Sequence, residues 1–121
     1  MPHIVTYVSQ RGMDQIDLGF PGNQSGFTRT LEVIVAREFN HLAGEELVPG
    51  ETCVSDHLHT SNTMPKDIAV VIMVWKTDDR VWFADRIHEA ITRSIRALFL
   101  PSADMKVQVF LNIVGDTTGR S

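Results

Sequence analysis

A proline directly follows the first methionine, and this position is the strongest chemical signal in the chain. If Met1 is removed, Pro2 carries a free secondary amine, a group that no other residue type supplies. Beneath apolar side chains such as Ile4 and Trp75, the charged amine would be poorly solvated, so the neutral amine would stay available as a base. Such a base can take a proton from a carbon next to a carbonyl group and return it elsewhere. The alternative is that Pro2 only begins a strand, where proline is tolerated.

Two cations, Lys76 and Arg80, stand at the ends of the sequence Lys76-Thr-Asp-Asp-Arg80, between an apolar run and a helical pattern. The N-terminus of a helix already favours anions, and cations beside it would strengthen the binding of a carboxylate. We therefore expect these residues, Arg80 first, to bind and polarise a small anionic substrate. The alternative is a solvated turn in which they pair with Asp78 or Asp79, an arrangement that contributes little to stability.

Two histidines, His57 and His59, lie two residues apart, so on a strand they would point to the same face. Catalytic zinc sites use three protein ligands and structural zinc sites use four. His3 or His41 would reach the pair only through the fold. We therefore expect no metal site and no cofactor.

The composition predicts one folded domain over residues 1–121, since 43% of the residues are hydrophobic and 21% are charged. A formal net charge of −4 without a basic run argues against binding to nucleic acid. The longest apolar run, Ile68–Trp75, is far shorter than the roughly 20 residues needed to span a membrane. The single cysteine and the lack of a signal-peptide pattern predict a cytoplasmic protein.

Hydrophobic periodicity predicts a strand, a helix and a weaker strand in the first half of the chain. Residues 4–8 are mostly β-branched or aromatic and favour a strand, whereas residues 9–26 are dense in turn formers and predict a long loop. Apolar residues at helical spacing follow, with Ser25 as the N-cap and Gly44 as the stop. Residues 52–58 form the weakest expected strand.

The second half has clearer patterns. The continuous apolar run Ile68–Trp75 predicts a strand buried on both faces. Asp78 or Asp79 is expected to cap a helix that ends before Pro101. Val107–Val114 is the last expected strand.

The resulting order is β-α-β followed by β-α-β, with unit one at about residues 2–61 and unit two at about residues 66–114. Right-handed crossovers in both units would place both helices on the same side of one sheet. The predicted fold class is therefore α+β, with two pseudo-repeated βαβ units forming a four-stranded mixed sheet covered by two helices on one face. The other face would expose apolar side chains, so we expect an oligomer in which a partner subunit covers it.

The chain resembles the tautomerase superfamily in its Met1-Pro2 start, the strand that follows at once, and the repeated plan. Its opening, Pro2-His-Ile-Val-Thr-Tyr-Val-Ser-Gln10, is similar to that of the cis-3-chloroacrylic acid dehalogenase group. Residues 67–113 resemble 5-carboxymethyl-2-hydroxymuconate isomerase and 4-oxalocrotonate tautomerase. The combination of these segments carries the resemblance more than any single motif does.

The resemblance implies a homotrimer and a cofactor-independent isomerase that acts on small unsaturated oxo-carboxylates, with Pro2 as general base. If the two units lie antiparallel, as in these families, Lys76 and Arg80 come close to Pro2. Arg11 is similar in position to a substrate-binding arginine of the one-unit tautomerases. Phe110 falls where the dehalogenases have a tyrosine, and would line the pocket; the alternative for this residue is ordinary core packing.

The sequence also departs from these families. The dehalogenases use a carboxylate beyond the last strand to position water, and here that region offers only Asp116. The isomerase has an arginine on its second strand, where this chain has Cys53-Val-Ser. A decarboxylase, hydratase or dehalogenase on the same scaffold therefore stays open, as does a non-catalytic ferredoxin-like ligand-binding module. Two parallel strand pairs would favour the tautomerase plan, and interleaved antiparallel pairs the ferredoxin-like module.

Overall fold

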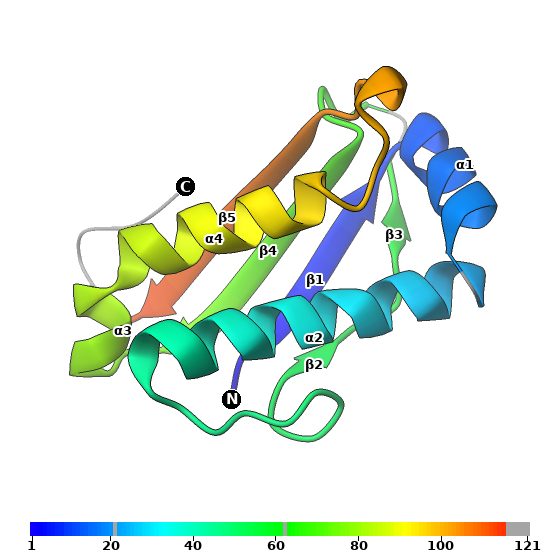
Figure 1. Ribbon diagram of the computed structural model, residues 1–121. Helices are drawn as coiled ribbons and strands as arrows, with labels where there is room; N and C mark the ends of the chain where they lie inside the picture. Colours follow the sequence, from blue (N-terminus) through cyan, green and yellow to red (C-terminus); the bar gives the residue numbers. More distant parts are fainter. Residues whose placement is uncertain (21, 62, 116–121) are drawn as a thin grey trace.

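The structure is a computed structural model that describes residues 1–20, 22–61 and 63–115, and its fold is α+β (Figure 1). A mixed sheet has the strand order β2-β1-β4-β5, and the short β3 pairs with β1 beyond β2. The strands are β1 (His3–Val8), β2 (Val54–Ser55), β3 (His59–Thr60), β4 (Ile68–Trp75) and β5 (Val107–Val114). The helices are α1 (Gln10–Gly19), α2 (Asn23–Ala43), α3 (Asp78–Trp82) and α4 (Ala84–Arg96), and a 3₁₀ turn covers Pro101–Ala103.

The sheet contains two parallel pairs joined by one antiparallel pair. β1 runs parallel to β2 and β3, and β4 runs parallel to β5. β1 and β4 are antiparallel neighbours, with His3 opposite Met73 and Val8 opposite Ile68. The start of β1 therefore lies beside the end of β4, which is the proximity expected from the sequence.

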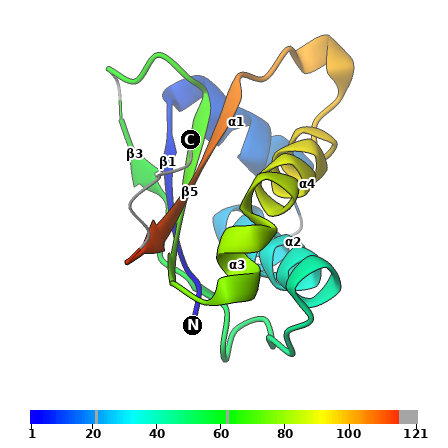
Figure 2. The same ribbon diagram turned by 90° about the vertical axis from the view of Figure 1, so that its left-hand side faces the viewer.

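The helices lie on one side of the sheet, and α2 and α4 pack side by side across it (Figure 2). Side chains alternate along β1 and β5, so that every second residue enters the core. Among the largest fully buried side chains are Ile4 and Ile72 from the sheet and Phe39 from α2. Burial of these apolar surfaces against the helices is the main stabilising contribution to such a core.

The opposite side of the sheet, here called the outer face, carries no helix of the described chain (Figure 2). Tyr7 of β1 is 41% exposed there, and Met73 and Trp75 of β4 are 44% and 68% exposed. The expectation that Ile68–Trp75 is buried on both faces is therefore wrong for the end of β4 within a single chain.

The long loop expected over residues 9–26 is largely helical. Ser9 caps α1 by accepting a hydrogen bond from the Gly12 amide at 3.1 Å, and Met13 and Ile16 are buried. A Cβ atom at Gly12 would collide with the Asp67 carbonyl oxygen, so glycine permits close packing here. The glycines in this segment reflect helix packing as well as turns, and composition alone does not separate the two.

Three other expected elements differ in detail. The strand expected over residues 52–58 is reduced to β2, and a further short strand, β3, follows it outside that range. The second predicted helix is split into α3 and α4 at Phe83, and Thr77 rather than an aspartate caps it, accepting from the Arg80 amide at 3.1 Å. The first predicted helix, α2, begins at Asn23, before the expected cap Ser25.

Within the described residues, none of the helices is both long enough and apolar enough to cross a bilayer.

Candidate functional site

A cavity of about 380 Å³ lies at the start of β1, and we call it the N-terminal pocket. The antiparallel pairing of β1 with β4 and the parallel pairing of β4 with β5 bring three strand ends together there. Most of its wall is apolar, and two titratable side chains from the described chain line it. The lining residues are Met1, His3, Val5, Asp56, Met73, Val74, Trp75 and Val114.

Pro2 is buried between Met1 and β1. Its carbonyl oxygen accepts a hydrogen bond from the Val54 amide at 3.1 Å, which ties the start of the chain to β2. Met1 is 61% exposed and lines the N-terminal pocket. Pro2 itself is not among the described residues that line the pocket; it is joined to the pocket through Met1, whose carbonyl carbon is bonded to the Pro2 nitrogen.

His3 and Asp56 meet at the same pocket. The distance from His3 Nε2 to Asp56 Oδ1 is 2.9 Å, and the side chains are 45% and 48% exposed. Nε2 is itself buried and lacks an aligned hydrogen bond, so the contact is a close approach outside hydrogen-bond geometry. The Asp56 amide donates to the Ile4 carbonyl oxygen at 3.0 Å, which extends the β1–β2 ladder by one residue and fixes the Asp56 backbone.

The sequence did not point to this pair. Asp56 was not a candidate, and His3 was considered only as a third metal ligand that the fold would have to bring to His57 and His59. The signal lies in the register: His3 pairs with Val54 in parallel strands, so residues just after β2 fall beside the start of β1.

Arg80 lies near the end of β4 and is engaged in a buried ion pair. Its side chain is 7% exposed, and its guanidinium donates to both carboxylate oxygens of Glu45, at 2.6 and 3.0 Å. A third donor reaches the Trp75 carbonyl oxygen at 2.9 Å. The alternative of a solvated turn paired with Asp78 or Asp79 is therefore wrong for Arg80. Its role in substrate binding stays a prediction, because Glu45 would have to release the guanidinium.

Lys76 is differently placed. It is exposed and directly follows Trp75, and its amide donates to the Val114 carbonyl oxygen at 2.9 Å. Trp75 and Val114 both line the N-terminal pocket. Within residues 1–20, 22–61 and 63–115, its ammonium group forms no ion pair. Lys76 is thus an unengaged cation beside the pocket.

Arg11 and Phe110 lie elsewhere in the chain. Arg11, in the first turn of α1, bonds to the Asp67 carboxylate at 2.6 Å and to the Ala103 carbonyl oxygen. It follows the far end of β1, whose six residues span roughly 20 Å at about 3.3 Å each. Phe110 is half-buried on the edge strand β5 and pairs with Val71 about midway along the β4–β5 ladder. Neither residue lines the N-terminal pocket, and their substrate-binding roles stay predictions.

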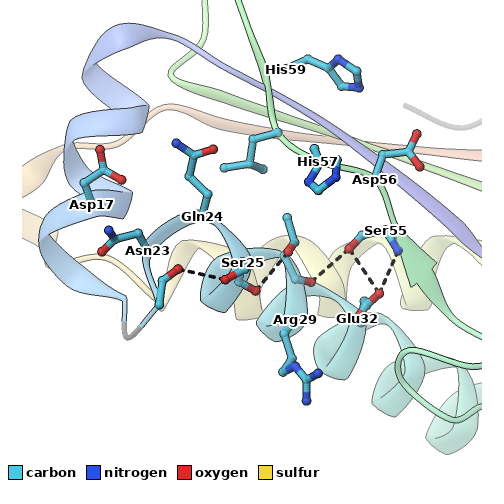
Figure 3. Close-up of a pocket in the computed structure, with 13 residues that line it drawn as sticks. Asp17, Asn23, Gln24, Ser25, Arg29, Glu32, Ser55, Asp56, His57 and His59 are labelled. Atoms are coloured by element: carbon cyan, nitrogen blue, oxygen red, sulfur yellow. Dashed lines mark hydrogen bonds between the residues drawn. The ribbon is translucent and has the colours of Figure 1, made fainter.

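A second, larger cavity of about 950 Å³ lies between the α1–α2 corner and the β2–β3 edge, and we call it the side cleft. Its lining is mixed in charge, with Asp17, Arg29 and Glu32 from the helices. Glu32 is already used, since its carboxylate accepts from the Ser55 amide at 2.9 Å and from the Ser55 hydroxyl at 3.3 Å (Figure 3). Figure 3 also shows the Arg29 guanidinium pointing away from His57. Asp56, His57 and His59 also line the side cleft, and within the described residues none of its titratable side chains forms an ion pair with another one that lines it.

The two histidines, His57 and His59, do not share one strand as the sequence predicted. His57 lies between the two ladders, and His59 lies in β3 with its ring centroid 5.4 Å from that of Tyr7. No group of three or more His, Cys, Asp or Glu side chains in the described part of the chain is arranged to hold a metal ion.

Cys53 does not contribute a nucleophile to either cavity. Its side chain is fully buried, and its thiol contacts the Glu32 carbonyl oxygen at 3.6 Å. Burial, helped by the negative charge of Glu32, raises the pKa of the Cys53 thiol to about 12. The thiol is therefore protonated at neutral pH and chemically inert.

A scan against models of known protein families and a search of curated proteins found no match to this chain.

Proposed function

We propose that this protein is a cofactor-independent isomerase of the tautomerase type. Its substrate is a small unsaturated or enolisable oxo-carboxylate, and its general base is the Pro2 amine exposed by removal of Met1. The observation that carries the proposal is that Met1, the residue bonded to the Pro2 nitrogen, lines a mostly apolar pocket large enough for a molecule of this size.

The apolar part of the pocket wall disfavours the charged form of the amine, whereas the Asp56 carboxylate in the same wall favours it. Val5, Met73 and Trp75 offer no hydrogen-bond partner for a charged amine. A general base contributes most when its neutral and protonated forms are both accessible near the working pH.

The strand pairing supports the tautomerase plan over the ferredoxin-like module. In this proposal residues 2–61 and 66–114 are two pseudo-repeated βαβ units, each with a parallel strand pair, joined through β1 and β4. A ferredoxin-like sheet would interleave antiparallel pairs instead.

The exposed apolar side chains of the outer face support a homotrimer in which subunits cover this face for one another. The face carries Tyr7, Met73 and Trp75 within one surface of the sheet. Arg11 and Phe110 would then act, if at all, in a pocket completed between subunits.

Lys76 is the cation that best suits the carboxylate of the substrate. It stands beside the pocket without an ion-pair partner in the described chain, whereas Arg80 already satisfies Glu45. The Lys76 ammonium group would bind the substrate carboxylate and so orient the reacting carbon of the substrate toward Pro2.

A hydratase or decarboxylase is the second candidate, because Asp56 places a carboxylate at the same pocket. Such a group can position a water molecule for attack on an activated double bond. Asp116, the carboxylate expected from the sequence for this task, lies outside the described residues. Product analysis with 3-oxo and 3-halo acrylates separates these reactions, since a tautomerase returns the isomer and releases neither carbon dioxide nor halide.

The test is the rate of phenylenolpyruvate ketonisation by native protein, by Pro2→Ala, and by the matched control Pro65→Ala, which changes an exposed proline distant from the pocket. Pro2→Ala replaces the secondary amine, so kcat is expected to fall by about 100-fold. Pro65→Ala is expected to keep the native rate. An unchanged rate in Pro2→Ala would sink the assignment.

A further inference from the structure

The N-terminal pocket holds two side chains that can exchange protons, His3 and Asp56, and the proposed isomerase reaction uses neither of them. Within the described chain, the other lining side chains are aliphatic, thioether or indole groups. A tautomerisation moves two protons, one on carbon and one on oxygen. An amine at Pro2 serves the carbon, and the apolar wall offers no partner for the oxygen.

The positions of His3 and Asp56 suggest different roles for the two side chains. The Asp56 backbone is fixed by its amide hydrogen bond to Ile4, and its carboxylate stands 2.9 Å from His3 Nε2. This contact is not an aligned hydrogen bond, but the negative charge of a carboxylate so close to Nε2 disfavours a lone pair on that nitrogen and favours the tautomer that carries the proton there. The other nitrogen, Nδ1, has no protein partner in the described part of the chain, so it keeps a lone pair free for a ligand.

We infer that His3 is the second proton-transfer group of this pocket and that Asp56 is its positioning residue. This inference rests on the proposed function. In ketonisation, His3 Nδ1 accepts the enol hydroxyl proton while the protonated Pro2 amine gives its proton to the carbon. The O–H bond and the amine N–H bond break, a C–H bond and an imidazole N–H bond form, and C=C–OH becomes CH–C=O. Solvent then carries one proton from the imidazolium back to the amine.

The reverse reaction uses the same groups with their roles exchanged. Pro2 takes the proton from carbon, and the His3 imidazolium donates to the carbonyl oxygen. The Asp56 carboxylate, 2.9 Å from Nε2, holds the ring in position in both directions. Two groups in opposite protonation states produce a bell-shaped dependence of kcat on pH.

A purely structural ion pair is the alternative. Pairs exposed to this degree contribute little to stability, so the loss of either partner would leave the fold nearly unchanged. Stability measurements alone therefore do not separate the two roles, and the kinetic readout does.

The experiment measures kcat and KM for phenylenolpyruvate ketonisation from pH 5 to 9 in His3→Gln and Asp56→Asn, with His41→Gln as the matched control. His41 is exposed on α2, away from the pocket. We expect His3→Gln to lower kcat by about 100-fold, the lower end for a general acid or base, and to remove the acidic limb of the profile. Asp56→Asn should lower kcat by less than His3→Gln does and should shift the acidic limb of the pH profile. His41→Gln should match native protein in both kcat and pH profile.

Nitrogen-15 NMR of the His3 ring provides a readout that does not depend on activity. The expected spectrum is that of a neutral ring protonated on Nε2, and Asp56→Asn should shift the population toward the Nδ1-protonated form. A ring protonated on Nδ1 in native protein would contradict the inference.

The outcomes also separate this inference from the proposed function. If Pro2→Ala loses activity while His3→Gln keeps native kcat and profile, the His3 assignment is wrong and the Pro2 base stands. If His3→Gln loses activity and Pro2→Ala does not, the base is misassigned and the pathway just described is wrong. If native protein does not ketonise phenylenolpyruvate and the His3 ring carries its proton on Nδ1, both assignments are overturned.

Discussion

At the scale of single residues, two cations that look equivalent in the sequence have different environments in the fold. Arg80 is buried, forms a two-point ion pair with Glu45, and places its guanidinium 5.6 Å from the centroid of the Phe39 ring. Lys76 is exposed at the edge of the N-terminal pocket. The sequence identified both as candidates, and it could not tell them apart because the partner of Arg80 lies 35 residues away.

Arg80→Ala is expected to reduce the free energy of unfolding by about 3 kcal/mol, since it leaves the half-buried Glu45 carboxylate without its partner. Urea unfolding followed by circular dichroism measures this change. The double variant Arg80→Met with Glu45→Gln should recover much of the loss, because neither buried charge then remains unpaired. A stable Arg80→Ala would show that the ion pair is dispensable.

Lys76→Gln is expected to raise KM for phenylenolpyruvate by about tenfold, which corresponds to about 1.4 kcal/mol of binding. The stability of the fold should not change, since the side chain is exposed. The matched control is Lys106→Gln, an exposed lysine that precedes β5 at the opposite end of the strand. Equal KM values for the two variants would contradict the role of Lys76.

His3 and Asp56 belong to the part of the site that the sequence does not reveal. The two residues are far apart in the chain, and their contact depends on the register of β1 against β2. The strand over residues 52–58 was the weakest expected, because Asp56 and His57 interrupt its apolar residues, and in the structure β2 and β3 have only two residues each. Pro2 needed no register, since its chemistry follows from its place after Met1.

At the scale of elements, the strong patterns predict strands well. The expected strands at Ile68–Trp75 and Val107–Val114 are confirmed with the same bounds, because continuous or alternating apolar runs leave little choice. The helix α1 was missed because its glycines look like turn residues. The reason for Gly12 is a tertiary contact with the Asp67 carbonyl oxygen, which no local pattern contains.

Gly12→Ala is expected to lower the free energy of unfolding by more than 1 kcal/mol, although alanine favours helix by about that amount. The added Cβ would force α1 away from the segment before β4. Gly19→Ala in the same helix is the control, because a Cβ there meets nothing within 4 Å. Thermal unfolding of the two variants should move in opposite directions. Equal effects would mean that the contact at Gly12 relaxes without cost.

At the scale of the whole molecule, the apolar outer face sets the expected assembly. A single chain leaves Tyr7, Met73 and Trp75 in contact with water on one side of the sheet. The fold class follows from the sequence, since the order of strands and helices allows few arrangements. The proposed homotrimer does not follow from the structure of one chain, because a surface that covers the outer face would belong to another subunit.

Sedimentation equilibrium is expected to give a trimer, and Met73→Asp should dissociate it by placing a charge in the interface. Trp82→Asp is the control, because Trp82 is 81% exposed on α3, away from the outer face. A native protein that sediments as a monomer at micromolar concentration would contradict the trimer. Loss of the trimer in both variants would indicate nonspecific destabilisation instead.

The central claim is that the Pro2 nitrogen acts as a base, and the state of Met1 tests it most directly. The same sequence is prepared with Met1 removed and with Met1 retained, each form is verified by intact mass, and both are compared in phenylenolpyruvate ketonisation. When Met1 is retained, the Pro2 nitrogen is part of a peptide bond and is not basic, and Met1 fills part of the pocket. If Pro2 is the base, we expect activity in the protein without Met1 and a rate at least about 100-fold lower in the protein that retains Met1. Equal rates in the two forms would contradict it.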